Sequence, residues 1–115
     1  MGYRSEVLLA LKPKAQALLS TYIARGGAVA HFFTDEVCDE IDKRSDGDVT
    51  YHWDHVKWYE TYPEIAAVTD FMARLDDEDL EEEYKFVRIG EDDDDNETHG
   101  CGFEVGITRA ISWWE

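Results

Sequence analysis

The apolar residues of the first 27 positions form one strand-like run followed by one helix-like stripe. Ser5 to Leu11 is short and almost continuously apolar, which predicts a buried strand. Pro13 ends this run and suits the first turn of a helix. Apolar residues at three-to-four spacing then give that helix its stripe: Ala17, Leu18 and Tyr22, with Ala15 or Leu19 beside them. Gly26-Gly27 predicts where the helix stops.

The segment from Ala28 to Ser45 fits two structures. Apolar residues four apart favour a helix: Phe33, Val37 and Ile41. Thr34 would be the N-cap of that helix. The Asp46-Gly47 dipeptide, followed by alternating apolar positions, favours a β-hairpin instead. We predict the hairpin, with Val49 to Tyr59, a segment dense in β-branched and aromatic residues, as its second strand.

A second helix is predicted to begin at Pro63, and its apolar stripe is the clearest periodic pattern in the chain: Ile65, Val68, Phe71, Met72 and Leu75. Asp76 to Glu83 is an acidic connection, and Tyr84 to Ile89 is a predicted strand. Gly90 to Gly100 is predicted to be a loop. Phe103 to Trp114 is predicted to be the last strand, because Phe103, Val105 and Ile107 alternate.

This order of elements predicts a single α+β domain over residues 1–115. We expect a mainly antiparallel sheet of four to five strands, with two helices packed on one face. A hydrophobic content of 43%, with 15 aromatic residues, is enough for a real core. No apolar run approaches the roughly 20 residues of a membrane-spanning helix, and the first residues lack the features of a signal peptide.

Charge changes this picture more than any motif does. The chain has 27 acidic and 11 basic residues, a formal net charge of −16. Thirteen of the 22 residues from Asp76 to Glu97 are acidic, against only Lys85 and Arg88. Self-repulsion on this scale destabilises a compact domain, so we expect the charge to serve a basic partner or a cation. Direct binding to nucleic acid or to anionic membrane is disfavoured, because it requires a Lys/Arg surface.

The charge density is close to that of DNA. A folded chain of this length has a radius of gyration of about 13 Å and a body roughly 35 Å across. B-DNA carries one charge per ~1.7 Å of axis, so 16 charges correspond to roughly 27 Å of duplex. The protein is therefore predicted to imitate nucleic acid toward a basic, nucleic-acid-binding partner protein.

The acidic loop from Glu91 to Glu97 admits three interpretations. The first is a calcium site that begins at Asp93 and reaches its twelfth position at Glu104, but Thr98 stands where such a loop needs glycine. The second is a solvated loop without a ligand. The third is a partner surface, favoured because Asp76 to Glu83 forms a second acidic cluster. The strand between the two clusters would hold them about 20 Å apart.

The residues predicted to contact the partner are carboxylates from both clusters and one aromatic residue at the end of the chain. They are Asp76, Asp77, Glu78, Asp79, Glu82, Glu91, Asp92, Asp93, Asp94, Asp95 and Trp114. Tryptophan is enriched at interface hot spots, and adjacent strand residues face opposite sides of a sheet. Trp113-Trp114 therefore also suggests a homodimer formed through this edge.

Catalytic and cofactor motifs are weak, and we predict a protein that is not an enzyme and binds no cofactor. Glu83-Tyr84-Lys85, with Asp70 or Asp76, matches part of a metal-dependent nuclease strand, a pattern that arises by chance in acidic chains. His52 and His55 would face opposite sides of a strand, so they would not share a zinc ion. Cys38 and Cys101 lie in no motif and are expected to be free thiols.

Three segments resemble small uncharacterised acidic proteins encoded by bacteriophages and prophages. They are Met1-Gly2-Tyr3-Arg4-Ser5, Lys57-Trp58-Tyr59 with Tyr62-Pro63-Glu64, and Phe86 to Asp92. The resemblance implies a viral source and expression in a bacterial host cytoplasm, and it carries over no site residues. The leading hypothesis is a phage inhibitor of a host DNA- or RNA-binding protein, of the anti-restriction, anti-CRISPR or repair-enzyme-inhibitor type. The alternative is an acidic interaction or assembly module that uses an aromatic surface.

Overall fold

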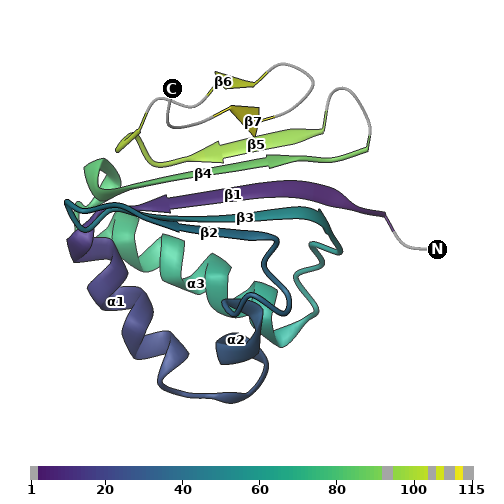
Figure 1. The fold of residues 1–115 in the computed structure, drawn as a ribbon, viewed down its shortest axis with the longest axis horizontal. Helices are drawn as coiled ribbons and strands as arrows, with labels where there is room; N and C mark the ends of the chain where they lie inside the picture. Colours follow the sequence, from purple (N-terminus) through teal and green to yellow (C-terminus); the bar gives the residue numbers. More distant parts are fainter. Residues whose placement is uncertain (1–2, 92–94, 104–105, 108–110, 113–115) are drawn as a thin grey trace.

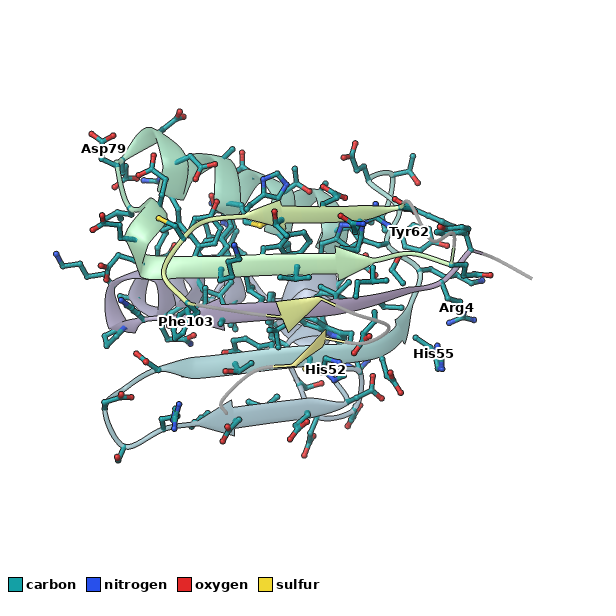
Figure 2. All side chains as sticks on the ribbon, turned by 90° about the horizontal axis from the view of Figure 1, so that it is seen from above. Arg4, His52, His55, Tyr62, Asp79 and Phe103 are labelled. Carbon is teal, nitrogen blue, oxygen red and sulfur yellow. The ribbon has the colours of Figure 1, made fainter. Side chains whose placement is uncertain are left out.

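A five-stranded antiparallel sheet forms the centre of the molecule, with strand order β2-β3-β1-β4-β5. The computed structural model describes residues 3–91, 95–103, 106–107 and 111–112. The helices all cover one face of the sheet, and a short β6–β7 pair lies over the opposite face (Figures 1 and 2). The predicted α+β class, with an antiparallel sheet and helices on one face, is confirmed.

The chain builds the fold from small elements. They are β1 (Ser5–Leu11), α1 (Pro13–Ile23), α2 (Gly27–Phe32), β2 (Glu40–Lys43), β3 (Val49–Val56), α3 (Pro63–Asp77), the 3₁₀ turn η1 (Glu81–Glu83), β4 (Tyr84–Ile89), β5 (Asn96–His99), β6 (Gly106–Ile107) and β7 (Ile111–Ser112). The radius of gyration is 13.3 Å and the extents are 34 × 33 × 27 Å. Within the described ranges, no helix is both long and apolar enough to cross a membrane.

β1 is the central strand and is buried on both faces. Val7, Leu9 and Leu11 point toward the helices and belong to the main core. Leu8 points the other way and is fully buried with Val87 in a second apolar cluster. β1 pairs with β3 on one side and β4 on the other, so backbone hydrogen bonds hold both neighbours to it. Burial on both faces explains why β1 is a continuous apolar run rather than an alternating one.

The helices supply the other layer of the core. All five residues of the stripe predicted for α3 are buried, as expected. On α1 the buried residues are Ala15, Leu19 and Tyr22, whereas Ala17 is exposed and Leu18 is half-buried. The prediction for Ala17 was wrong, because it lies two residues from Ala15 and therefore about 200° around the helix from the buried stripe.

The ambiguous segment forms the predicted hairpin, since β2 and β3 pair on either side of the Asp46-Gly47 turn. A third, short helix that the pattern did not predict, α2, precedes it, and Thr34 follows this helix instead of capping another. The Phe32 ring stacks on Trp53 at 4.5 Å, and the Trp53 indole N–H donates to the Phe32 carbonyl at 3.2 Å. Tertiary packing of aromatic rings therefore decides the structure of this segment.

The C-terminal third departs most from the prediction. β5 lies inside the segment expected to be a loop. Its sequence is polar and shows no apolar alternation, so only its pairing with β4 identifies it as a strand. The prediction of one last strand from Phe103 to Trp114 was wrong, because β6 and β7, which both lie within it, are separate short strands that pair with each other in antiparallel fashion. Gly100 makes the preceding turn with φ +79°, and a Cβ there would lie 2.4 Å from the Tyr84 carbonyl oxygen. Val105 and Trp114 lie outside the described residues.

Candidate functional site

The first candidate site is the acidic C-terminal end of α3. The Leu80 N–H donates to the Leu75 carbonyl at 2.8 Å, and the Asp79 N–H donates to the Asp76 carbonyl at 3.2 Å. This pair of bonds is a Schellman motif, and it places Asp79 in the left-handed region at φ 59°. Glycine normally fills that position because it lacks a Cβ. The end of the helix is thus closed and ordered, with an acidic residue where glycine is favoured.

The charge at this helix end opposes the helix dipole. Asp76, Asp77, Glu78 and Asp79 are all exposed at the negative end of α3. Among the described residues, only Glu78 of these four has an ion pair, with Arg74 at 3.0 Å. Each unfavourable charge at such an end costs roughly 0.3–1 kcal/mol at low salt. Local stability therefore does not explain the cluster.

Asp76 is tied more closely to the core than its neighbours are. Its carboxylate accepts a 2.7 Å hydrogen bond from the Tyr84 hydroxyl. Burial, together with Asp76, raises the pKa of Tyr84, so this hydroxyl remains a donor. Asp77, Glu78, Asp79 and Glu82 are exposed and available to a partner. Figure 2 shows Asp79 at one end of the molecule, far from Arg4 at the other.

The second predicted cluster is partly neutralised within the protein. Asp95 accepts two hydrogen bonds from Arg88, at 2.7 and 3.2 Å, and one from the Tyr3 hydroxyl at 2.6 Å. Glu91 is exposed, and its carboxylate accepts from the Arg4 backbone N–H. Asp92, Asp93 and Asp94 lie outside the described residues, as does Glu104 of the hypothetical calcium loop. The charge of Asp95 is therefore compensated by Arg88.

A further acidic surface was missed from the sequence. Five of the eight residues from 35 to 42 are acidic, and none is basic: Asp35, Glu36, Asp39, Glu40 and Asp42. They lie on β2 and the connection that leads into it, along the edge of the sheet opposite β5. The sequence does show this local excess of acidic residues, but only the denser acidic run after Asp76 was considered as a partner surface.

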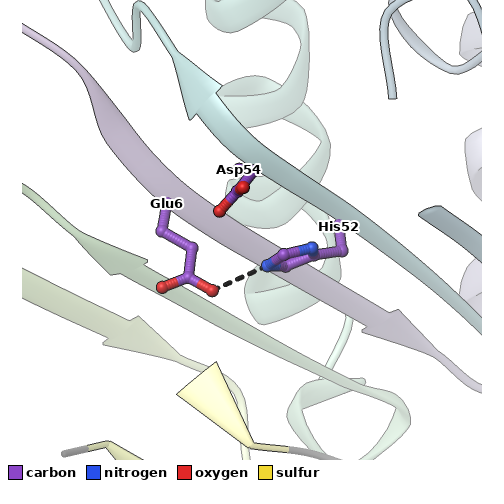
Figure 3. A group of neighbouring side chains, drawn as sticks. All are labelled: Glu6, His52 and Asp54. Atoms are coloured by element: carbon purple, nitrogen blue, oxygen red, sulfur yellow. Dashed lines mark hydrogen bonds and ion pairs between the residues drawn. The ribbon is translucent and has the colours of Figure 1, made fainter. Parts of the chain in front are cut away.

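Three residues of metal-ligating type lie close together on the sheet face away from the helices (Figure 3). Glu6, His52 and Asp54 have ligand atoms that all lie within 4.8 Å of one another. His52 Nε2 is 2.7 Å from Glu6 Oε2. The β1–β3 register shifts between Ser5 and Val7, and Glu6 lies in this bulge. A sequence-based search could have noted His52 and Asp54 two apart on one strand face, but not Glu6.

The residues of the weak nuclease pattern make hydrogen bonds within the fold. Asp70 and Asp76, the carboxylates considered for it, accept hydrogen bonds from Tyr22 and Tyr84. Lys85 donates to the Gly100 carbonyl at 3.2 Å. The two cysteines are free, with Cys38 buried and Cys101 exposed. Burial raises the pKa of the Cys38 thiol to about 11, and its Sγ lies 3.2 Å from two carbonyl oxygens.

A pocket of about 350 Å³ lies where β3, α3 and the segment after α2 meet. Phe32, Trp53 and Tyr62 give it aromatic walls, and Arg4 and His55 lie at the same end of the molecule (Figure 2). The Arg4 guanidinium donates to the His55 carbonyl at 3.2 Å.

No family model, curated protein or solved structure matches this chain. Its function is therefore inferred from the side chains themselves.

Replacing Asp79 tests whether its backbone is strained. Asp79→Gly should raise the free energy of unfolding by about 0.5–1 kcal/mol, because glycine adopts positive φ without a Cβ clash. Asp79→Asn is the matched control, since asparagine tolerates the left-handed region but removes the charge. Urea unfolding followed by circular dichroism measures both. A less stable Asp79→Gly protein would contradict the assignment of strain at this residue.

Proposed function

We propose that the protein binds a basic, nucleic-acid-binding protein and competes with nucleic acid for it. The observation that carries this proposal is the set of exposed carboxylates at the negative end of α3. They oppose the helix dipole, and one of them holds a strained backbone conformation. Proteins break local rules of stability mainly at functional sites.

The arrangement of the charge suits phosphate mimicry. β4 runs from the α3 end toward the turn that contains Glu91, a separation of about 20 Å at ~3.3 Å per residue. The acidic edge at β2 lies across the sheet from this surface and is not part of the proposed contact. A basic groove that follows a nucleic-acid backbone presents cations over similar lengths. Association would be fast and sensitive to salt.

The resemblance to acidic phage proteins suggests the partner's origin. We propose that the target is a bacterial host protein of a defence or repair system, and that inhibition is the outcome of binding. A tagged protein would be incubated with bacterial lysate, eluted by a salt step and analysed by mass spectrometry. A nucleic-acid-binding protein released between about 0.2 and 0.5 M salt supports the proposal. If no protein is retained, or if the retained partner stays bound at high salt, the result argues against the proposal.

Charge reversal then tests the site. Asp77→Lys, Glu78→Lys and Glu82→Lys, combined, should weaken binding to the captured partner by about 100-fold, since three phosphate-like contacts become repulsive. The matched control reverses three acids elsewhere: Asp35→Lys, Glu36→Lys and Glu60→Lys. We expect the control to lose only about threefold, through weaker long-range steering. Equal losses in both proteins would show that net charge, and not this site, drives binding.

The pocket supports one alternative function. An acidic interaction module could receive a partner side chain between Phe32, Trp53 and Tyr62. In that case Tyr62→Ala would weaken partner binding more than the triple charge reversal, and the complex would survive high salt. The same salt-step experiment therefore separates the two proposals.

A further inference from the structure

Glu6, His52 and Asp54 converge on the sheet face opposite the helices, and the geometry points to a binding site for a divalent transition metal of the zinc class. This inference is independent of the proposed partner. It rests on the positions, burial and charges of three side chains from two neighbouring strands.

The distances suit a small ion. Ligand atoms around tetrahedral zinc lie about 3.3 Å apart, given metal–ligand bonds of about 2.0–2.1 Å. Here the donor atoms lie within 4.8 Å of one another, and His52 Nε2 and Glu6 Oε2, 2.7 Å apart, share a hydrogen bond that a bound metal would replace. Shifts of an ångström or so would place all three at bonding distance. Asp54 is exposed, so its side chain is free to make that adjustment.

The charges at the cluster favour a dication. Glu6 and Asp54 bring two carboxylates together, and the described residues give Asp54 no ion pair. Glu40 adds another carboxylate nearby, because it is the register partner of His52 on β2 and so shares its face of the sheet. Two carboxylates this close repel each other, and a dication bound between them would remove that repulsion. One divalent ion would balance Glu6 and Asp54 with a neutral imidazole.

The fold holds two of the ligands in place. The side chains of His52 and Glu6 are only 12% and 18% exposed, so their positions are restricted by packing. His52 and Asp54 are two apart on β3 and therefore point to the same side. The bulge in β1 brings Glu6 to them from the next strand, and bulges commonly redirect a side chain toward a site.

The donor set indicates the class of metal. One imidazole nitrogen with two carboxylate oxygens suits Zn²⁺ or Co²⁺, and leaves a position for water. Ca²⁺ and Mg²⁺ are hard ions that take oxygen ligands, so an imidazole nitrogen in the set favours the zinc class over them. Zinc bound here would link β1 to β3 on the outer face of the sheet. The diffuse acidic surface elsewhere binds cations without this selectivity.

Cobalt spectroscopy and zinc calorimetry test the site. The wild-type protein would be titrated with Co²⁺, and separately with Zn²⁺, at about 0.15 M salt with excess Mg²⁺ to suppress diffuse binding. We expect one Co²⁺ per chain, with the intense visible bands of a low-coordinate ion that hydrated cobalt lacks. Zinc should displace it. In nuclear magnetic resonance spectra, zinc should shift the ring signals of one of the four histidines.

Three variants decide whether the proposed residues hold the metal. His52→Gln and Asp54→Asn should each weaken zinc binding by at least about tenfold and remove the cobalt bands. Glu40→Gln is the matched control, because it removes one charge from the same face without removing a ligand, and it should change affinity less than about threefold. Asp54 is exposed, so Asp54→Asn should fold even if His52→Gln does not. Absence of cobalt bands in the wild type, or equal loss in Asp54→Asn and Glu40→Gln, would overturn the proposal.

Discussion

Trp53→Ala should lower the free energy of unfolding by about 3–5 kcal/mol, the usual cost of removing a buried tryptophan. Trp53 is 1% exposed and lies among other aromatic residues. Its ring stacks on Phe32 at 4.5 Å with an interplanar angle of 11°, and Phe33 meets it edge-on at 5.6 Å. Small domains are stable by only about 5–15 kcal/mol, so the variant should be close to the limit of folding.

Other replacements separate the contribution of ring packing from that of the indole N–H hydrogen bond. Trp53→Phe keeps an aromatic ring against Phe32 but removes the N–H donor to its carbonyl, so we expect a smaller loss of about 1–2 kcal/mol. Trp58→Ala is the comparison for a half-buried tryptophan in the same cluster. Guanidinium unfolding followed by far-ultraviolet circular dichroism measures all three. A cost below about 1 kcal/mol for Trp53→Ala would show that this cluster does not organise the fold.

Arg88→Met should be the second most damaging substitution, with an expected loss of about 2–3 kcal/mol near pH 7. Breaking a buried ion pair on one side typically costs about 3–5 kcal/mol, and partial exposure of the acidic partners reduces this. The Arg88 side chain is 13% exposed and donates to Glu97 at 2.7 Å, to Asp95 and to the Ser5 hydroxyl. Its loss leaves two carboxylates without their cation.

The controls for Arg88 distinguish charge from geometry. Arg88→Lys keeps the charge but loses the bidentate contact with Asp95, so we expect the free energy of unfolding to fall by an intermediate amount, about 1 kcal/mol. Combining Arg88→Met with Asp95→Asn and Glu97→Gln should recover most of the stability, because no uncompensated charge remains. Failure of the triple variant to recover would show that packing of the Arg88 side chain matters more than its charge.

The effect of Arg88 should also depend on pH. Arg88, aided by Tyr3, holds the pKa of Asp95 below its ordinary value of 3.8. Partial burial works to raise the pKa of Glu97, but Arg88 and His99 outweigh it and leave this pKa below 4.5. The unfolded chain therefore binds more protons than the folded one in this range, so the stabilisation is full above about pH 5 and is lost as pH falls through the folded-state pKa values.

The stability difference between the wild type and Arg88→Met should accordingly stay constant from about pH 7 to pH 5 and shrink as the pH falls below about 5. Urea unfolding at several pH values measures it. A difference that stays constant down to the acidic end would show that Asp95 and Glu97 are not coupled to Arg88.

Local pattern was enough to predict much of the fold. β1, β4 and the buried stripe of α3 lie where the spacing of apolar residues predicted them, because a strand or helix needs an apolar side at its own period. The Asp46-Gly47 turn likewise predicted the β2–β3 hairpin. The acidic excess after Asp76 is visible in the order of residues, so the sequence alone was enough to propose an acidic partner surface in this part of the chain.

The candidate sites were less predictable, because each joins residues that are distant in the chain. Glu6 meets His52 and Asp54 only through the β1–β3 register and a bulge. Asp95 looked like one more free acid in a loop, whereas pairing of β4 with β5 brings it and Glu97 to Arg88. The strand period of two residues and the helix period of 3.6 do not predict such contacts between residues that are distant in the chain.

Composition and local pattern are thus sufficient for the class of fold, the position of the main apolar elements and the sign of the charge that the protein presents. The packed fold is needed to learn which carboxylates are neutralised, which converge with a histidine, and which remain exposed at the end of α3. The physical reason is range: periodicity and composition act between near neighbours, whereas strand register and helix docking set distances across the whole domain.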